Sequence, residues 1–140
     1  MSNFATTTSL RTTVTCALRA ARQAQGVSAS QLSLRVGRHR TWVGQVERGT
    51  HNLTFSALDL LVRELVFTVP ALEPYRTLVA KRIKQERLKC GLSQEALSQA
   101  AGLSVNFVHT LESGRANSSV DQVEAIAKVL QVEGIALYAI

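Results

Sequence analysis

Apolar residues recur in the second half of this chain at the three- and four-residue spacing of helices with one buried face. They are Leu92, Leu97, Ala101, Val108, Leu111, Val123, Ile126 and Leu130. Glycines interrupt the pattern at positions 91, 102 and 114, and Ser93 and Ser104 stand where helix N-caps are expected. The pattern predicts helices over 81–89, 93–101 and 104–112, followed by a fourth. Helix, tight glycine turn and helix is the geometry of a helix-turn-helix.

The same pattern occurs twice. A shift of 65 positions places 18–65 over 83–130 without a gap, and eleven of these aligned positions are identical. Ser33 and Ser98 are one such pair, at the place where the second and third helices of each unit should cross. We therefore expect a duplicated helical unit.

Short β-type runs follow the fourth helix of each unit, at 66–69 and 135–140. Pro70 and Pro74 bracket the segment between the units, and the Ser- and Thr-rich start has no periodicity. Four parts are expected: a mobile arm that contains Arg11, a first domain, a linker, and a second domain with a C-terminal strand, over 1–13, 14–69, 70–75 and 76–140.

The second unit, GLSQEALSQAAGLSVNFVHTLESGRANSSVDQVEAIAKVL, resembles the Xre or lambda-repressor-like helix-turn-helix family of DNA-binding proteins. The Gly-Leu-Ser-Gln entry, the Gly-x-Ser turn and the Glu-x-Gly ending stand at the family's spacing. The first unit is similar, but Ala29 replaces the family's Gln and His39 replaces its Ser. The resemblance implies a mainly α fold, with two tandem bundles that together leave no room for a separate effector or catalytic domain.

The resemblance also implies residue roles. Base-edge contacts are expected from Arg40, Thr41, Gln45, Val105, Asn106 and Thr110. Arg suits guanine, Gln and Asn suit adenine, and Val or the Thr methyl suits the thymine methyl. Phosphate contacts are expected from Ser28, Arg38, His39, Arg48, Asn52, Ser93, Gln94, Ser104, Arg115 and Asn117. Any one of these residues could instead lie on a solvated helix face without contacting DNA. This explanation suits the whole set less well. Two ion pairs, Arg22 with Glu47 and Arg87 with Glu112, are expected to hold the third helices in place.

Charge separates the two halves. The chain has a net charge of +6 and a pI near 10.0. Residues 1–70 hold +5 of this charge and residues 71–140 hold +1. A basic surface suits a polyanionic partner, so the first unit should attract phosphate more strongly. The second unit should either read an AT-rich half-site through Val105 and Asn106 or serve partly as a protein-binding face.

The leading hypothesis is therefore a sequence-specific transcriptional regulator that binds a double-stranded DNA operator. A repressor of a phage, plasmid or other mobile-element locus is favoured. The alternative is a protein-interaction module, an antitoxin or anti-regulator with a regulatory protein partner and secondary DNA binding. The β-type runs could pair inside one chain, which gives a pseudo-dimer, or between two chains, which gives a homodimer.

Other function classes lack their residue patterns. We expect no enzyme, because the sequence shows no nucleophile paired with a base, no paired carboxylates and no phosphate-binding glycine loop. Cys16 and Cys90 lie in no metal-binding pattern, and His39, His51 and His109 form no metal-spaced group, so neither a metal nor another cofactor is expected. No apolar run has the length of a membrane span, and we expect a cytoplasmic protein that associates with the bacterial nucleoid when bound to DNA.

Overall fold

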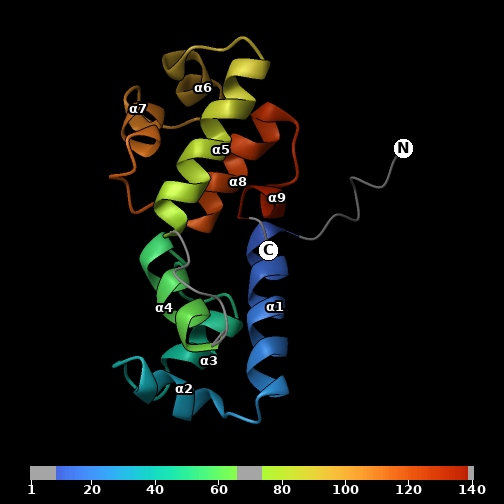
Figure 1. Cartoon of the computed structure of the whole chain (residues 1–140), viewed down its shortest axis with the longest axis vertical. Helices are drawn as coiled ribbons and strands as arrows, with labels where there is room; N and C mark the ends of the chain where they lie inside the picture. The colour runs from blue at the N-terminus through green and yellow to red at the C-terminus, as the bar shows by residue number, and fades with distance from the viewer. Residues whose placement is uncertain (1–8, 66–73, 139–140) are drawn as a thin grey trace, which may run out of the picture.

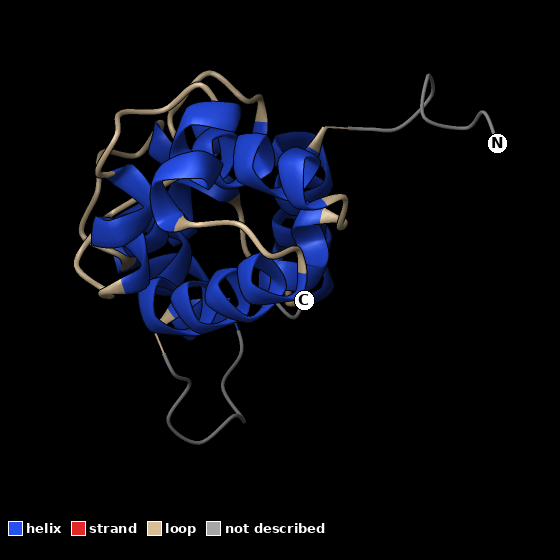
Figure 2. Cartoon of the chain, turned by 90° about the horizontal axis from the view of Figure 1, so that it is seen from above, coloured by secondary structure: helices blue, strands red, loops and turns tan. Residues whose placement is uncertain are grey.

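The computed structural model describes residues 9–65 and 74–138, which fold into helices joined by short loops (Figure 2). The first unit contains α1 (Leu10–Ala24), α2 (Ala29–Arg35), α3 (Trp42–Glu47) and α4 (Phe55–Leu65). The second contains α5 (Tyr75–Lys89), α6 (Gln94–Ala100), α7 (Phe107–Glu112), α8 (Val120–Leu130) and α9 (Gly134–Tyr138). The predicted mainly α fold is confirmed. Each of α1 to α4 recurs 65 positions later with the same length, as the sequence repeat predicts.

Helix ends follow the predicted serine and glycine signals in most places. The Ser93 hydroxyl accepts a hydrogen bond from the Ala96 amide and caps α6, and Gly102 takes the left-handed conformation with φ of 73°. Ser104 is not the N-cap of α7, which begins at Phe107. Its carbonyl accepts the Phe107 amide instead, because the chain makes one further tight turn before the helix starts.

The expected N-terminal arm is too long, because α1 begins at Leu10 rather than at 14. The Ser9 hydroxyl caps the helix by accepting a hydrogen bond from the Thr12 amide. Leu10 is buried, and its amide donates to the Glu124 carboxylate at 2.8 Å. Arg11 therefore lies in a helix and not in a mobile tail. Residues 1–8 lie outside the described part of the chain.

The first helix of the second unit also starts earlier than predicted, since α5 begins at Tyr75 and not at 81. The Tyr75 amide donates to the Asp59 carboxylate at 2.9 Å, which satisfies a helix-terminal donor that the helix itself leaves free. The last position of the expected linker thus belongs to a helix, and 70–73 lie outside the described residues.

The predicted C-terminal strand is wrong, because Gly134–Tyr138 forms the short helix α9. Its apolar side chains pack against other helices rather than against a strand: the Tyr138 ring centroid lies 5.6 Å from that of Tyr75 and 6.1 Å from that of Phe55. Burial raises the pKa of the Tyr138 phenol. The first predicted strand, 66–69, and residues 139–140 lie outside the described part.

The two units lie end to end, with α2 near one end of the molecule and α6 near the other (Figure 1). Where they meet, the Phe55 amide donates to the Ser118 carbonyl at 3.0 Å, and the Val120 amide donates to the Leu53 carbonyl at 2.8 Å. These bonds flank an isolated antiparallel bridge between Thr54 and Ser119. Under the 65-residue shift, 53 corresponds to 118, 54 to 119 and 55 to 120, so each bond is the counterpart of the other.

A second pair of contacts between the units is reciprocal in the same way. Leu10 corresponds to Tyr75, and Glu124 corresponds to Asp59, so the two carboxylates that receive the first amides of α1 and α5 are also counterparts. Reciprocal contacts of this kind define an isologous interface, in which two like units are related by a twofold axis. The two units of this chain are therefore packed as an approximate twofold pair, and one hydrophobic core runs through both.

Candidate nucleic-acid interface

A buried serine fixes the crossing of the second and third helices in each unit. The Ser33 hydroxyl accepts a hydrogen bond from the Val43 amide at 2.9 Å and donates to the Ala29 carbonyl at 2.8 Å. Ser98 makes the corresponding bonds, including one from the Val108 amide at 3.0 Å. The sequence predicted only that small residues would be needed here. The hydroxyl also satisfies an amide at the start of the third helix that would otherwise be left without a partner.

In the first unit, a two-point ion pair ties α1 to α3. The Arg22 guanidinium donates to both Glu47 oxygens, from Nε at 2.7 Å and from Nη2 at 2.9 Å, and Nη1 donates to the Val27 carbonyl at 2.8 Å. The hydrogen bond with Glu47 raises the pKa of Arg22, and this effect outweighs the opposing effect of burial. Both side chains are nearly buried, so the pair holds α3 in place and is not available to DNA.

The second unit repeats this ion pair and adds a third partner. Arg87 binds both Glu112 oxygens, at 2.6 and 2.9 Å, and donates to the Leu92 carbonyl at 2.8 Å. The Gln94 side-chain nitrogen donates to Glu112 at 2.9 Å, and the Gln94 side-chain oxygen lies 3.2 Å from His109 Nδ1. Gln94, expected to bind phosphate, is thus already engaged within the unit. Ala29 occupies the corresponding position in the first unit, and its side chain has no amide group that could bond Glu47.

The structure brings each group of expected base-reading residues together at the start of a third helix. In both groups two residues lie in the turn before the helix and one lies on its first exposed turn. All are solvent-exposed except Gln45, which is half-buried. The two groups, on α3 and on α7 respectively, are Arg40, Thr41 and Gln45, and Val105, Asn106 and Thr110.

Around α3, the expected phosphate-binding residues form an exposed basic rim. The Arg38 guanidinium carbon lies 5.0 Å from the centre of the Trp42 ring, a cation–π arrangement. The His39 Nδ1 lies 2.9 Å from the Thr41 hydroxyl. Arg48 folds back along α3, since a Cβ added at Gly44 would lie 3.2 Å from its Nη1. These contacts order three basic or titratable side chains beside the reading group.

The remaining expected phosphate contacts do not all serve one surface. The Asn117 side chain accepts the Ser56 amide at 2.9 Å, so it bonds across the interface between the units. Arg115 donates from Nε to the Ser113 hydroxyl at 3.1 Å beside the end of α7. The other expected contacts are exposed: Ser28 and Ser93 at the starts of α2 and α6, Asn52 after α3, and Ser104 before α7.

Arg11, which the sequence placed in a mobile arm, is a functional candidate whose position and contacts the sequence did not predict. Its guanidinium contacts the end of α3 in the first unit and Asp121 in the second. The signal was available, because the 65-residue alignment extends beyond position 18 and places Arg11 over Arg76.

Within the described residues, no group of three His, Cys, Asp or Glu side chains is arranged to hold a metal ion. Nor is any described helix both long and apolar enough to cross a membrane.

Comparisons with known proteins place a helix-turn-helix domain in each half. A helix-turn-helix domain model matches 15–72, and a second helix-turn-helix model matches 83–136. The control protein C.SmaI of Serratia marcescens is 40% identical over 55 residues, which are 39% of this chain and 66% of that protein. The chain thus matches slightly under two thirds of that relative's length.

A solved structure described as a hypothetical transcription factor NHTF from Neisseria is 31% identical to this chain. The superposition covers 51% of this chain and 86% of that one, with a TM-score of 0.45. Two separate matches to the same kind of domain are what the internal repeat requires. The chain belongs to the Xre or lambda-repressor-like helix-turn-helix family and carries two such domains in tandem.

Proposed function

We propose that this chain is a transcriptional regulator that binds double-stranded DNA in a sequence-specific manner, with α3 and α7 as its two reading helices. The observation that carries the proposal is the pair of exposed reading groups, each at the start of a third helix that a buried ion pair and a buried serine hold in place. A reading helix held in this way can present its side chains to base edges without first being ordered.

The reciprocal interface supports one chain as the complete DNA-binding unit. Family dimers place two recognition helices about 34 Å apart, in successive turns of the major groove. Here the two units of a single chain are related by an approximate twofold axis, which supports the proposal that α3 and α7 act as such a pair. The paired units therefore form an intrachain pseudo-dimer, although α-helical packing joins them rather than the strands expected from the sequence.

The surface around α3 favours this unit as the main source of DNA affinity. Exposed Arg35, Arg38, Arg40 and Arg48 surround it, whereas the corresponding positions of the second unit are Ala100, Leu103, Val105 and Ser113. Basic groups near phosphates give affinity, while groups at base edges give specificity. Two unlike reading groups should select two unlike half-sites, guanine-containing on one side and AT-rich on the other.

Control by concentration or by a partner protein fits a regulator made of two such domains. A repressor of a phage, plasmid or other mobile-element locus is the form we propose, and the relative named as a control protein agrees with a regulatory role.

A protein-interaction module is the second candidate function, as an antitoxin or anti-regulator. It is favoured by Val105, whose side chain is 54% exposed in the turn that leads into α7. An exposed apolar residue at the centre of a reading surface suits a protein partner as well as a thymine methyl.

Selection from a random pool of DNA duplexes at stated salt tests the proposed function. We expect enrichment of a bipartite site with two unlike half-sites about one helical turn apart. A long palindrome would instead indicate an assembly of two chains with four reading helices. No enrichment would favour the protein-interaction module.

Arg40→Ala should relax discrimination at one guanine of the selected site by about 1–3 kcal/mol, because bidentate contacts to O6 and N7 are lost. Competition binding with duplexes that differ at that base pair measures this change. Arg48→Ala is the matched control: it should weaken all duplexes alike and reduce the salt slope by about one unit. If Arg40→Ala leaves binding unchanged while Asn106→Ala abolishes it, the first unit is not the main reader.

Light scattering of the free protein should give a mass near 15.2 kDa, that of one chain. The reason is that each unit already uses its interface on the other unit of the same chain. A mass twice as large would mean that the units pair between chains, and the intrachain pseudo-dimer would be wrong.

A further inference from the structure

We propose that Arg11 is a positioning residue that sets the separation between the two reading helices and so the half-site spacing that the protein accepts. This inference rests on the proposed function. It names a determinant of spacing that lies outside both reading groups.

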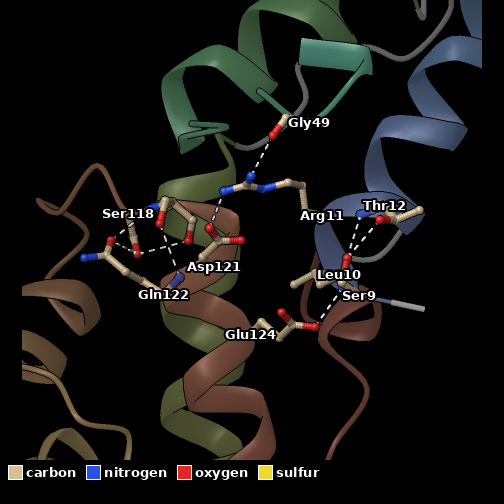
Figure 3. A network of polar contacts seen from close by, with 10 residues as sticks. Ser9, Leu10, Arg11, Thr12, Gly49, Ser118, Asp121, Gln122 and Glu124 are labelled. Carbon is tan, nitrogen blue, oxygen red and sulfur yellow. Dashed lines mark hydrogen bonds and ion pairs between the residues drawn. The ribbon is translucent and has the colours of Figure 1, made fainter. Parts of the chain in front are cut away.

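Arg11 connects the two units through one guanidinium group (Figure 3). Nη1 donates to the Gly49 carbonyl at 2.7 Å, and Nη2 forms an ion pair with the Asp121 carboxylate. Gly49 directly follows Arg48, the C-cap of α3, whereas Asp121 lies in the first turn of α8. The end of the first unit's reading helix is thereby tied to the second unit.

This connection occurs on one side of the pseudo-dimer only. The counterpart of Arg11 is Arg76, which donates to the Ser56 hydroxyl at 3.0 Å, and Ser56 is the counterpart of Asp121. Among the described contacts, Arg76 has no bond to Gly114, the counterpart of Gly49. A Cβ added at Gly49 would lie 3.6 Å from Arg11 Cδ, whereas one at Gly114 would meet nothing within 4 Å. Among the described contacts, Arg11 thus connects the end of α3 to the opposite unit, and Arg76 makes no corresponding connection to the end of α7.

The chemistry of the guanidinium suits this role. Its planar fork presents several donors in fixed directions, so one side chain can hold two acceptors at a set separation. The backbone next to Arg11 is also bonded to the second unit, because the Leu10 amide donates to the Glu124 carboxylate.

The ion pair is partly exposed, with side-chain exposures of 30% for Arg11 and 52% for Asp121. Partly exposed pairs contribute little to folding stability, because water screens them. Removing Arg11 should therefore change how the units are held relative to each other while leaving both units folded. That difference makes the role testable.

The test uses the full chain and duplexes that carry both selected half-sites at the best separation and at separations one and two base pairs longer or shorter. For wild type we expect a clear preference for one separation. Arg11→Ala should reduce the affinity ratio between the best and the neighbouring separations by about three- to tenfold. Its affinity for a duplex with one half-site should stay the same. If Arg11 only contacted phosphate, Arg11→Ala would instead lower all affinities alike and keep the ratio at the wild-type value.

Three further variants distinguish positioning from charge or general destabilisation. Asp121→Asn should reduce the ratio as Arg11→Ala does, since it weakens the same connection from the other end. Arg11→Lys should also reduce it, because a compact ammonium group lacks the planar fork that holds the two acceptors at a set separation. Arg76→Ala, the matched control on the other side, should leave the ratio at the wild-type value.

The inference is overturned if Arg11→Ala keeps the wild-type ratio, if Arg11→Lys restores it, or if Arg76→Ala reduces it equally. In each of these cases wild type still binds the bipartite duplex, so the proposed function stands. If wild type binds no duplex selectively, the proposed function fails first, and the role of Arg11 fails with it.

Discussion

Glu112→Ala is expected to lower the free energy of unfolding by about 3–5 kcal/mol, because it leaves the Arg87 guanidinium buried without its counter-charge. The side chains of Arg87 and Glu112 are only 9% and 3% exposed, and the carboxylate also accepts the Gln94 amide. Arginine keeps its proton in proteins even without a partner, so the Arg87 guanidinium cannot escape this cost by becoming neutral. Urea unfolding followed by circular dichroism measures the loss.

Glu86→Ala is the control for this prediction. Glu86 pairs with Lys89 at 3.3 Å on the surface of α5, the helix that also carries Arg87, and Lys89 is 72% exposed. An exposed pair of this kind is expected to contribute about 0–1 kcal/mol. Similar small losses for both variants would show that the Arg87–Glu112 pair does not hold α7 against α5.

Phe55→Ala should cost about 3–5 kcal/mol of stability, because it removes a fully buried aromatic ring and leaves a cavity. Phe55 lies at the first position of α4, where the units meet, and Tyr138 from α9 packs against its ring. We therefore expect weaker binding to the bipartite duplex as well as a lower urea midpoint, since the cavity loosens the contact between the units.

Leu34→Ala serves as the apolar control for Phe55→Ala. The Leu34 side chain is 65% exposed on α2, so its truncation should change stability by less than about 0.5 kcal/mol. If Phe55→Ala cost no more than this, the first unit would not depend on packing against the second, and the single core through both units would be contradicted.

Local patterns predicted most of the helices. Apolar spacing, serine caps and glycine stops act within a few residues, so α6 and the end of α7 could be placed from the sequence. The repeat then transferred these boundaries to the first unit, where individual signals are weaker. The ion pairs of Arg22 and Arg87 could likewise be named, because the resemblance to a known family supplied partners that lie 25 positions apart.

The errors share one cause, namely partners distant in sequence. The start of α1 depends on Glu124, and the start of α5 depends on Asp59, so neither end carries a complete local signal. The run at 135–138 is wholly apolar and therefore predicted a strand, yet α9 is helical and packs against α1, α5 and α8. Asn117 stays a predicted phosphate contact, but its side-chain oxygen also accepts the Ser56 amide of the opposite unit, a bond that no local signal predicted.

The sequence by itself determined that this chain is a duplicated helix-turn-helix protein and which half is more basic, and its resemblance to a known family indicated where base-reading residues are expected. The fold follows from periodicity and from the repeat, and the charge difference follows from composition. Only the tertiary structure decided that the two units meet as an approximate twofold pair and that Arg11 ties one reading helix to the opposite unit. These contacts join residues from 16 to 114 positions apart, and whether they form depends on how the helices that carry them pack.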